Sequence, residues 1–149
     1  MTLERPNIAA MQGYAPGEQP QDLATIKLNT NENPYPLSPE VTMALSSFDV
    51  ASLRRYPSPI ADEFRRVAAD LHELSLDNVI PTNGGDELLR LMLTTFVAEG
   101  EVVATTKPTY SLYPVLAAIQ GAKLCEIDLD QHWRLPSDLI QQLHAMKAK

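Results

Sequence analysis

The sequence predicts an α/β fold with a mostly parallel sheet flanked by helices, and three observations lead to that prediction. Short strand-like runs alternate with helical patterns in the second half of the chain, which is typical of parallel sheets. A glycine pair, Gly84-Gly85, leads from one such run into an apolar helix. Serine-proline pairs mark the starts of two earlier helices. With 149 residues, the chain is long enough for one domain with its own core.

The first segment, residues 1–37, is expected to be an irregular arm. It shows no sustained hydrophobic period, and proline and glycine interrupt regular structure along its whole length. Such an arm is expected to run over a surface, for example that of a partner subunit. Its prolines are Pro6, Pro16, Pro20, Pro34 and Pro36.

Two helices are expected at the start of the domain that we assign to residues 38–149. Ser38 can cap the first helix, and Pro39 suits its first position. Ser58-Pro59 repeats this start signal for the second helix. One face of the first helix is expected to carry Val41, Ala44, Leu45 and Phe48. The buried stripe of the second helix is expected to be Phe64, Val67, Ala68, Leu71 and Leu74.

The remaining elements are expected to alternate. Three strands are predicted, in residues 78–82, 102–106 and 122–127. The helix after Gly84-Gly85 is apolar almost all round, which predicts burial on most sides, and Gly100 is expected to end it. Its apolar residues are Leu88, Leu89, Leu91, Met92, Leu93, Phe96 and Val97. A helix over residues 113–120 is closed by Gly121, and Leu139, Leu143 and Met146 mark a last helix.

Composition and charge exclude several classes of function. The chain is 44% hydrophobic and 21% charged, as in globular proteins, and its net charge of −7 argues against nucleic acid or an anionic membrane as a partner. No apolar run approaches the ~20 residues that span a bilayer. Residues 1–14 lack the apolar region of a secretory signal, so a cytoplasmic location is expected. The single cysteine excludes an internal disulfide and any multi-cysteine metal site.

The segment Gly84, Gly85, Asp86, Glu87 is a candidate anion-binding turn. Glycine allows a close approach of the backbone to a ligand, and the unpaired N–H groups and dipole of a helix N-terminus favour negative charge. The carboxylates of Asp86 and Glu87 suit a first helical turn for the same reason. A turn that only reverses the chain is the alternative interpretation.

A second candidate segment, Pro108-Thr109-Tyr110, follows the strand in residues 102–106. Ligands of open α/β sheets bind beyond the carboxyl ends of the strands, so this segment and the glycine turn are expected to face one site. The ring of Tyr110 can stack on a flat ligand, although a role in the core is the alternative. Together the two segments fit a planar phosphorylated cofactor.

Four segments in this order carry a family resemblance: LNTNENPYP, LRRYPSP, NGGDELL and PTYSLYP. They resemble the N-terminal part of the fold-type I pyridoxal-phosphate (PLP) aminotransferases and, among these, the histidinol-phosphate aminotransferases. The similarity runs from about Tyr14 to about Ile127 but covers less than half of a typical family member. It implies the fold of the N-terminal part of the PLP-binding large domain, preceded by the irregular arm.

The resemblance implies roles for individual residues. Residues Gly84 to Glu87 match the turn that holds the cofactor phosphate, and Tyr110 matches the aromatic residue that stacks on the pyridine ring. Tyr56 matches a tyrosine that reaches the cofactor phosphate of the partner subunit, which implies a homodimer. Tyr14, Asn31 and Asn33 match the segments that line the substrate entrance.

The implied reaction is a transamination in histidine biosynthesis. An amino group passes from histidinol phosphate to 2-oxoglutarate, which gives imidazole-acetol phosphate and glutamate, so the substrate is a phosphorylated amino-acid precursor. Other class I and II aminotransferases and phosphothreonine decarboxylases are alternative enzymes. A non-catalytic relic or dimerisation module is the alternative outside enzymes.

The chain also departs from the family pattern. The family's Schiff-base lysine lies in the second half of its members, and no lysine here has a matching context. These lysines are Lys27, Lys107, Lys123, Lys147 and Lys149. We therefore expect a fragment that is inactive alone, with the catalytic lysine beyond residue 149. Pro36 and Ser58 replace a usual glycine and aspartate, and Gly85 lacks the small side chain that many relatives carry there.

Overall fold

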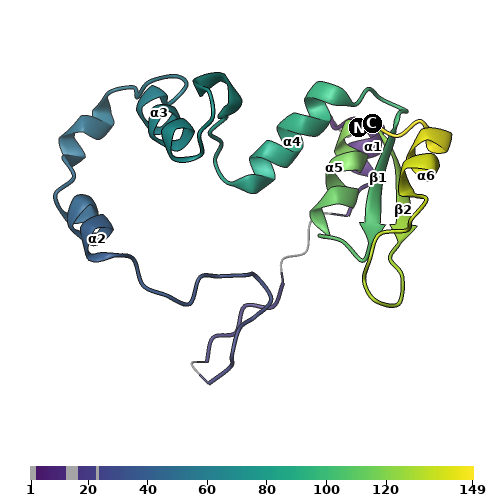
Figure 1. Ribbon diagram of the computed structural model, residues 1–149, viewed down its shortest axis with the longest axis horizontal. Helices are drawn as coiled ribbons and strands as arrows, with labels where there is room; N and C mark the ends of the chain where they lie inside the picture. Colours follow the sequence, from purple (N-terminus) through teal and green to yellow (C-terminus); the bar gives the residue numbers. More distant parts are fainter. Residues whose placement is uncertain (1–2, 13–16, 23) are drawn as a thin grey trace. The chain divides into compact units, whose positions relative to one another are not determined.

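The computed structural model describes residues 3–12, 17–22 and 24–149. The chain divides into two compact units: residues 1–15 and 82–149, here the sheet unit, and residues 16–81, here the helical unit (Figure 1). The boundary expected at residue 37 stays a prediction. Within the expected irregular arm, Pro6–Ala9 form one short helix, α1, and the described residues 17–37 contain no helix or strand.

In the sheet unit a strand, a helix and a strand follow one another along the sequence: β1 (Val102–Lys107), α5 (Leu112–Gln120) and β2 (Lys123–Asp128). The strands are parallel, in a register that runs from Val102 opposite Lys123 to Lys107 opposite Asp128. Gly121 ends α5 in the left-handed conformation, with φ of 72°. These three elements confirm the predicted alternation, with boundaries that differ by one residue.

Three further helices belong to the sheet unit: α1, α4 (Gly85–Phe96) and α6 (Leu139–Met146). Helix α4 packs against α5 (Figure 1). Helix α1 is tied to the last turn of α5, because Arg5 Nη2 donates to Ile119 O and Asn7 Nδ2 donates to Ala118 O, each at 3.1 Å. The chain's N-terminal segment therefore covers carbonyls that an isolated helix leaves unpaired.

The core of the sheet unit is small. Its buried apolar side chains lie on β1, α5, β2 and the end of α4: Val97, Val103, Leu112, Leu116, Ala117 and Ile127. The expected burial of α4 on most sides is wrong, because no residue of Gly85–Phe96 is buried. A helix that is apolar all round needs neighbours on several sides, and α5 is its main neighbour among the described residues.

The helical unit contains α2 (Pro39–Ser46), the 3₁₀ helices η1 (Val50–Arg54) and η2 (Leu76–Asn78), and α3 (Asp62–Leu71). The predicted cap of α2 is confirmed, since Ser38 Oγ accepts from Val41 N at 3.3 Å and Pro39 takes the first position. The predicted start at Ser58-Pro59 is wrong: α3 begins at Asp62, after Ala61 in the left-handed region. Ser58 Oγ accepts from Asp62 N at 3.3 Å, so this serine stabilises the turn before the helix.

The predicted buried stripe of α3 is also wrong. Ala69 is the buried residue of this helix, whereas Phe64, Val67, Leu71 and Leu74 are exposed. The contacts of α3 with the segment that follows it are made by a polar side chain, Arg65. Its Nε donates to Val79 O at 2.9 Å, and its Nη2 donates to Leu76 O at 2.8 Å. The apolar period is present, but the described part of the helical unit offers no layer to cover it.

The sheet has two strands, so the predicted third strand in residues 78–82 is wrong. Its first residue ends η2, and Val79 is extended but pairs with no strand among the described residues. Extended backbone becomes a strand only where a neighbour accepts its hydrogen bonds. The free edge of β1 receives a single parallel bridge, Val102 opposite Ala148, where Lys149 N donates to Val102 O at 3.0 Å.

One hydroxyl on β1 gives a stability prediction. Thr105 Oγ1 is buried and has no hydrogen-bond partner among the described residues, so Thr105→Val is expected to raise the free energy of unfolding by about 1 kcal/mol. Thr106→Val is the matched control, because Thr106 Oγ1 donates to Pro108 O at 3.2 Å, and its loss is expected to cost about 1 kcal/mol. Urea titrations of both variants test this, and equal destabilisation by the two would contradict it.

Candidate functional site

The glycine turn opens α4 as predicted, with Gly84 as the N-cap and Gly85 as the first helical residue. Gly84 has φ of 83° and ψ of 171°, a backbone conformation that is essentially restricted to glycine. No atom lies within 4 Å of the position that a Cβ would take at Gly84 or at Gly85. The backbone of the turn is therefore open to a ligand, and its N-cap has no side chain to satisfy the first-turn amides.

Two residues that were not predicted from the sequence, Thr82 and Asn83, shape this turn. Glu87 Oε2 accepts from Asn83 N at 2.6 Å and from Asn83 Nδ2 at 3.2 Å, and Thr82 Oγ1 donates to Gly84 O at 2.9 Å. Glu87 stands at the third helical position, as the glutamate of a capping box does, but it accepts from the residue before the N-cap and not from the N-cap itself. The Glu87 carboxylate thus holds the turn in place.

Tyr110 and Asp86, predicted to share one site, do lie together. The Tyr110 hydroxyl donates to the Asp86 carboxylate, with distances of 3.4 Å to Oδ1 and 3.5 Å to Oδ2. The ring of Tyr113 meets the ring of Tyr110 edge-on, with centroids 6.3 Å apart and planes at 87°. Tyr110 itself remains 45% exposed, so its ring stands beside the glycine turn with surface available to a flat ligand.

The charges at the turn have opposite effects on the binding of an anion. A helix N-terminus carries roughly half a positive charge, whereas Asp86 and Glu87 each carry a negative one. Both carboxylates are engaged elsewhere, with the Tyr110 hydroxyl and with Asn83. An anion is therefore held best by the backbone amides of the open glycine turn and not by the side chains around it. This arrangement of open backbone, amide donors and an adjacent ring fits the phosphate and flat ring of PLP.

Lys107, at the carboxyl end of β1, does not have the properties of a reactive amine. Its Nζ lies 3.0 Å from Glu126 Oε2, and this hydrogen bond and the negative charge of Glu126 raise the pKa of Lys107 above its ordinary value. An amine nucleophile must lose its proton near neutral pH, which requires a lowered pKa. Lys27 and Lys149 also form ion pairs, with Glu32 at 2.7 Å and Glu101 at 3.3 Å.

Three other predicted site residues, Asn31, Asn33 and Tyr56, belong to the helical unit. Asn31 adopts a left-handed conformation with φ of 52°, and Asn33 Oδ1 accepts from Tyr35 N at 3.0 Å. The Tyr56 side chain is fully exposed, at 103%. Tyr14 lies outside the described residues. The ligand-binding roles of all these residues stay predictions.

Two features are absent from the residues that the structure describes. No group of three or more His, Cys, Asp or Glu side chains there has an arrangement that holds a metal ion. None of the helices described is both long and apolar enough to traverse a bilayer.

Comparisons with known proteins agree on one family. Residues 24–147 match the family described as aminotransferase class I and II. A curated relative from Synechocystis sp., named histidinol-phosphate aminotransferase, is 41% identical over 140 residues, which are 94% of this chain and 40% of the relative. One from Rhodopirellula baltica with the same name is 42% identical over 144 residues, or 96% of this chain and 40% of the relative. The chain thus spans about 40% of the length of these curated relatives.

A solved structure shows the same fold. The histidinol-phosphate aminotransferase of Sinorhizobium meliloti, crystallised in complex with pyridoxal-5'-phosphate, aligns with a TM-score of 0.68 and 20% sequence identity. The alignment covers 74% of this chain and 30% of that one. The predicted α/β fold is confirmed by this likeness.

Proposed function

Because the chain belongs to the aminotransferase class I and II family, we propose that it forms the phosphate-holding part of a PLP-dependent aminotransferase. One observation carries the proposal: the open glycine turn at the start of α4 lies beside Tyr110, at the carboxyl end of β1. This is the edge of a parallel sheet at which ligands of such folds bind.

The proposed substrate is histidinol phosphate. The names of the two curated relatives, each more than 40% identical, support it. In the proposed reaction 2-oxoglutarate accepts the amino group, and imidazole-acetol phosphate and glutamate are the products, as a step in histidine biosynthesis. We further propose a cytoplasmic homodimer, in which Tyr56 serves the partner's site and Tyr14, Asn31 and Asn33 line the substrate entrance.

The residues of the sheet unit then have separable tasks. The N–H groups at Gly85 and Asp86 would hold the phosphate, and the helix dipole of α4 favours its negative charge. The Tyr110 ring would stack on the flat ring of the cofactor, while the Asp86 carboxylate orients the tyrosine hydroxyl. Glu87 and Asn83 keep the turn in the conformation that exposes the amides. Bound PLP supplies the aldehyde and electron-withdrawing ring through which amino groups are exchanged.

A cofactor titration of the 149-residue chain tests the proposal. Absorbance and fluorescence are expected to show saturable binding of PLP and much weaker binding of pyridoxal, which lacks the phosphate. After borohydride reduction, mass spectrometry is expected to find no specific adduct on Lys107, because Glu126 stabilises its protonated form. Equal binding of PLP and pyridoxal would overturn the proposed phosphate site, and a specific adduct on one lysine would contradict the predicted absence of the reactive amine.

A further inference from the structure

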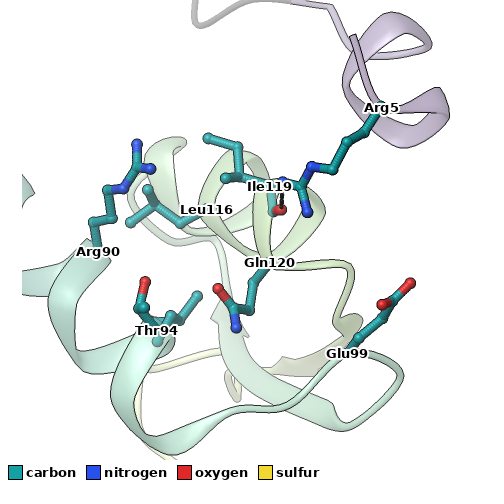
Figure 2. Close-up of a pocket in the computed structure, with 8 residues that line it drawn as sticks. Arg5, Arg90, Thr94, Glu99, Leu116, Ile119 and Gln120 are labelled. Atoms are coloured by element: carbon teal, nitrogen blue, oxygen red, sulfur yellow. Dashed lines mark hydrogen bonds between the residues drawn. The ribbon is translucent and has the colours of Figure 1, made fainter.

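A cavity of the sheet unit lies between α4 and α5 (Figure 2). Its volume is about 300 Å³, at the small end of the usual range for ligand sites. Thr94, on its wall, lies eight residues beyond Asp86 on α4, or about 12 Å at 1.5 Å per residue. The lining residues are Arg5, Arg90, Leu93, Thr94, Glu99, Leu116, Ile119 and Gln120.

Charged groups face this cavity without pairing with one another. Figure 2 shows Arg90 and Glu99 on opposite sides, with Gln120 between them and Arg5 reaching in from α1. None of the ion pairs formed within residues 3–12, 17–22 and 24–149 uses Arg5, Arg90 or Glu99. The cavity thus presents two guanidinium groups and one carboxylate, with a net charge of +1, in a chain whose net charge is −7.

Several of these side chains are held in position. Gln120 Nε2 donates to Val97 O at 2.7 Å, which fixes the orientation of its amide. Arg5 uses one of its five N–H donors on Ile119 O and keeps the others for a ligand. Glu99 Cγ lies 3.0 Å from the position that a Cβ would take at Gly121, so the backbone there leaves room for the glutamate stem. Gln120 and Arg5 are therefore placed before a ligand arrives, which lowers the entropic cost of binding.

We propose that this cavity binds a free acidic amino acid. Such a molecule carries two carboxylates and one ammonium group, with a net charge of −1. Each of these groups has a partner of opposite charge in the cavity, which offers two guanidinium groups and one carboxylate. Guanidinium–carboxylate pairs form strong, directional hydrogen bonds. In the complex the two carboxylates pair with Arg5 and Arg90, the ammonium group pairs with Glu99, and the methylene groups contact Leu116 and Ile119.

Isothermal titration calorimetry of the full 149-residue chain with L-glutamate tests this inference. We expect saturable binding, and weaker binding of glutarate, which has both carboxylates but no ammonium group. Arg90→Gln is expected to weaken the affinity for L-glutamate at least about tenfold, since it removes a charge-assisted pair. Glu99→Gln is expected to remove the preference for L-glutamate over glutarate.

Arg66→Gln is the matched control, because Arg66 is an exposed arginine of the helical unit that forms no ion pair among the described residues. It is expected to bind L-glutamate like the unmodified chain, and circular dichroism checks that each variant is folded. Three results would each overturn the proposal. The first is glutarate that binds as tightly as L-glutamate, and the second is an Arg90→Gln variant with unchanged affinity. The third is the absence of saturable binding at millimolar concentrations.

Discussion

Leu116→Ala is expected to lower the free energy of unfolding of the sheet unit by about 2–5 kcal/mol, the usual cost of deleting a leucine side chain from a core. Leu116 is only 6% exposed, and its helix α5 packs against both α4 and β2. The core of this unit is small, so no other layer compensates for the lost contacts. The midpoint of a urea unfolding curve, followed by circular dichroism, measures the effect.

Ile140→Ala provides the control for that substitution. Ile140 lies on α6 in the same unit and is 60% exposed, so its truncation is expected to change the free energy of unfolding by less than about 1 kcal/mol. Equal losses of stability in the two variants would show that the core does not lie around α5.

Gly84→Ala is expected to have the second large effect, a loss of about 1–3 kcal/mol of stability together with a loss of phosphate affinity. The reason is conformational, because nothing crowds a Cβ at this position but the φ of 83° and ψ of 171° are strained for alanine. Relief of this strain would turn the first-turn amides away from the ligand. Thermal unfolding and PLP titration of the same preparation measure both effects.

Gly85→Ala is the matched substitution one residue further on. Gly85 is the first residue of α4, and no atom lies within 4 Å of its Cβ position. Alanine suits a helix better than glycine by up to about 1 kcal/mol, so this variant is expected to be as stable as the original chain or more so. A Gly85→Ala variant that loses as much stability as Gly84→Ala would refute the conformational argument.

The elements that local chemistry determines were predicted well from the sequence. Ser38 and Pro39 start α2, Gly85 starts α4, and Gly121 ends α5, because each of these residues acts within one turn of chain. The strands around Val103 and Cys125 followed from their apolar character and from the helix between them. The likeness to solved structures confirms the fold class that these elements predicted.

Burial was predicted poorly, since it depends on what covers a face and not on the face itself. The stripe of α3 that includes Phe64 and Leu71 has the correct period but is exposed, and α4 is apolar all round without a buried residue. The run around Val79 is extended but unpaired, since a strand requires a neighbour that the local sequence does not specify.

In the candidate site, too, some features were predicted from the sequence and others were not. The rule that ligands bind at the carboxyl ends of parallel strands placed Tyr110 beside the glycine turn, and the structure brings its hydroxyl to Asp86. The contribution of Asn83 to the turn was missed, because Asn83 and Glu87 are four residues apart and a capping box has a spacing of three. The pairing of Lys107 with Glu126 joins two strands, so no local pattern predicts it.

The most direct test of the central claim is a set of backbone amide chemical shifts, recorded by NMR on the ¹⁵N-labelled chain during titration with PLP and, separately, with pyridoxal. If the glycine turn holds the cofactor phosphate, the amides of Gly84, Gly85 and Asp86 move with saturation on addition of PLP, and they stay near their original positions with pyridoxal. Shifts of equal size with both ligands, or PLP-induced shifts that leave these three amides unchanged, would contradict the proposed phosphate site.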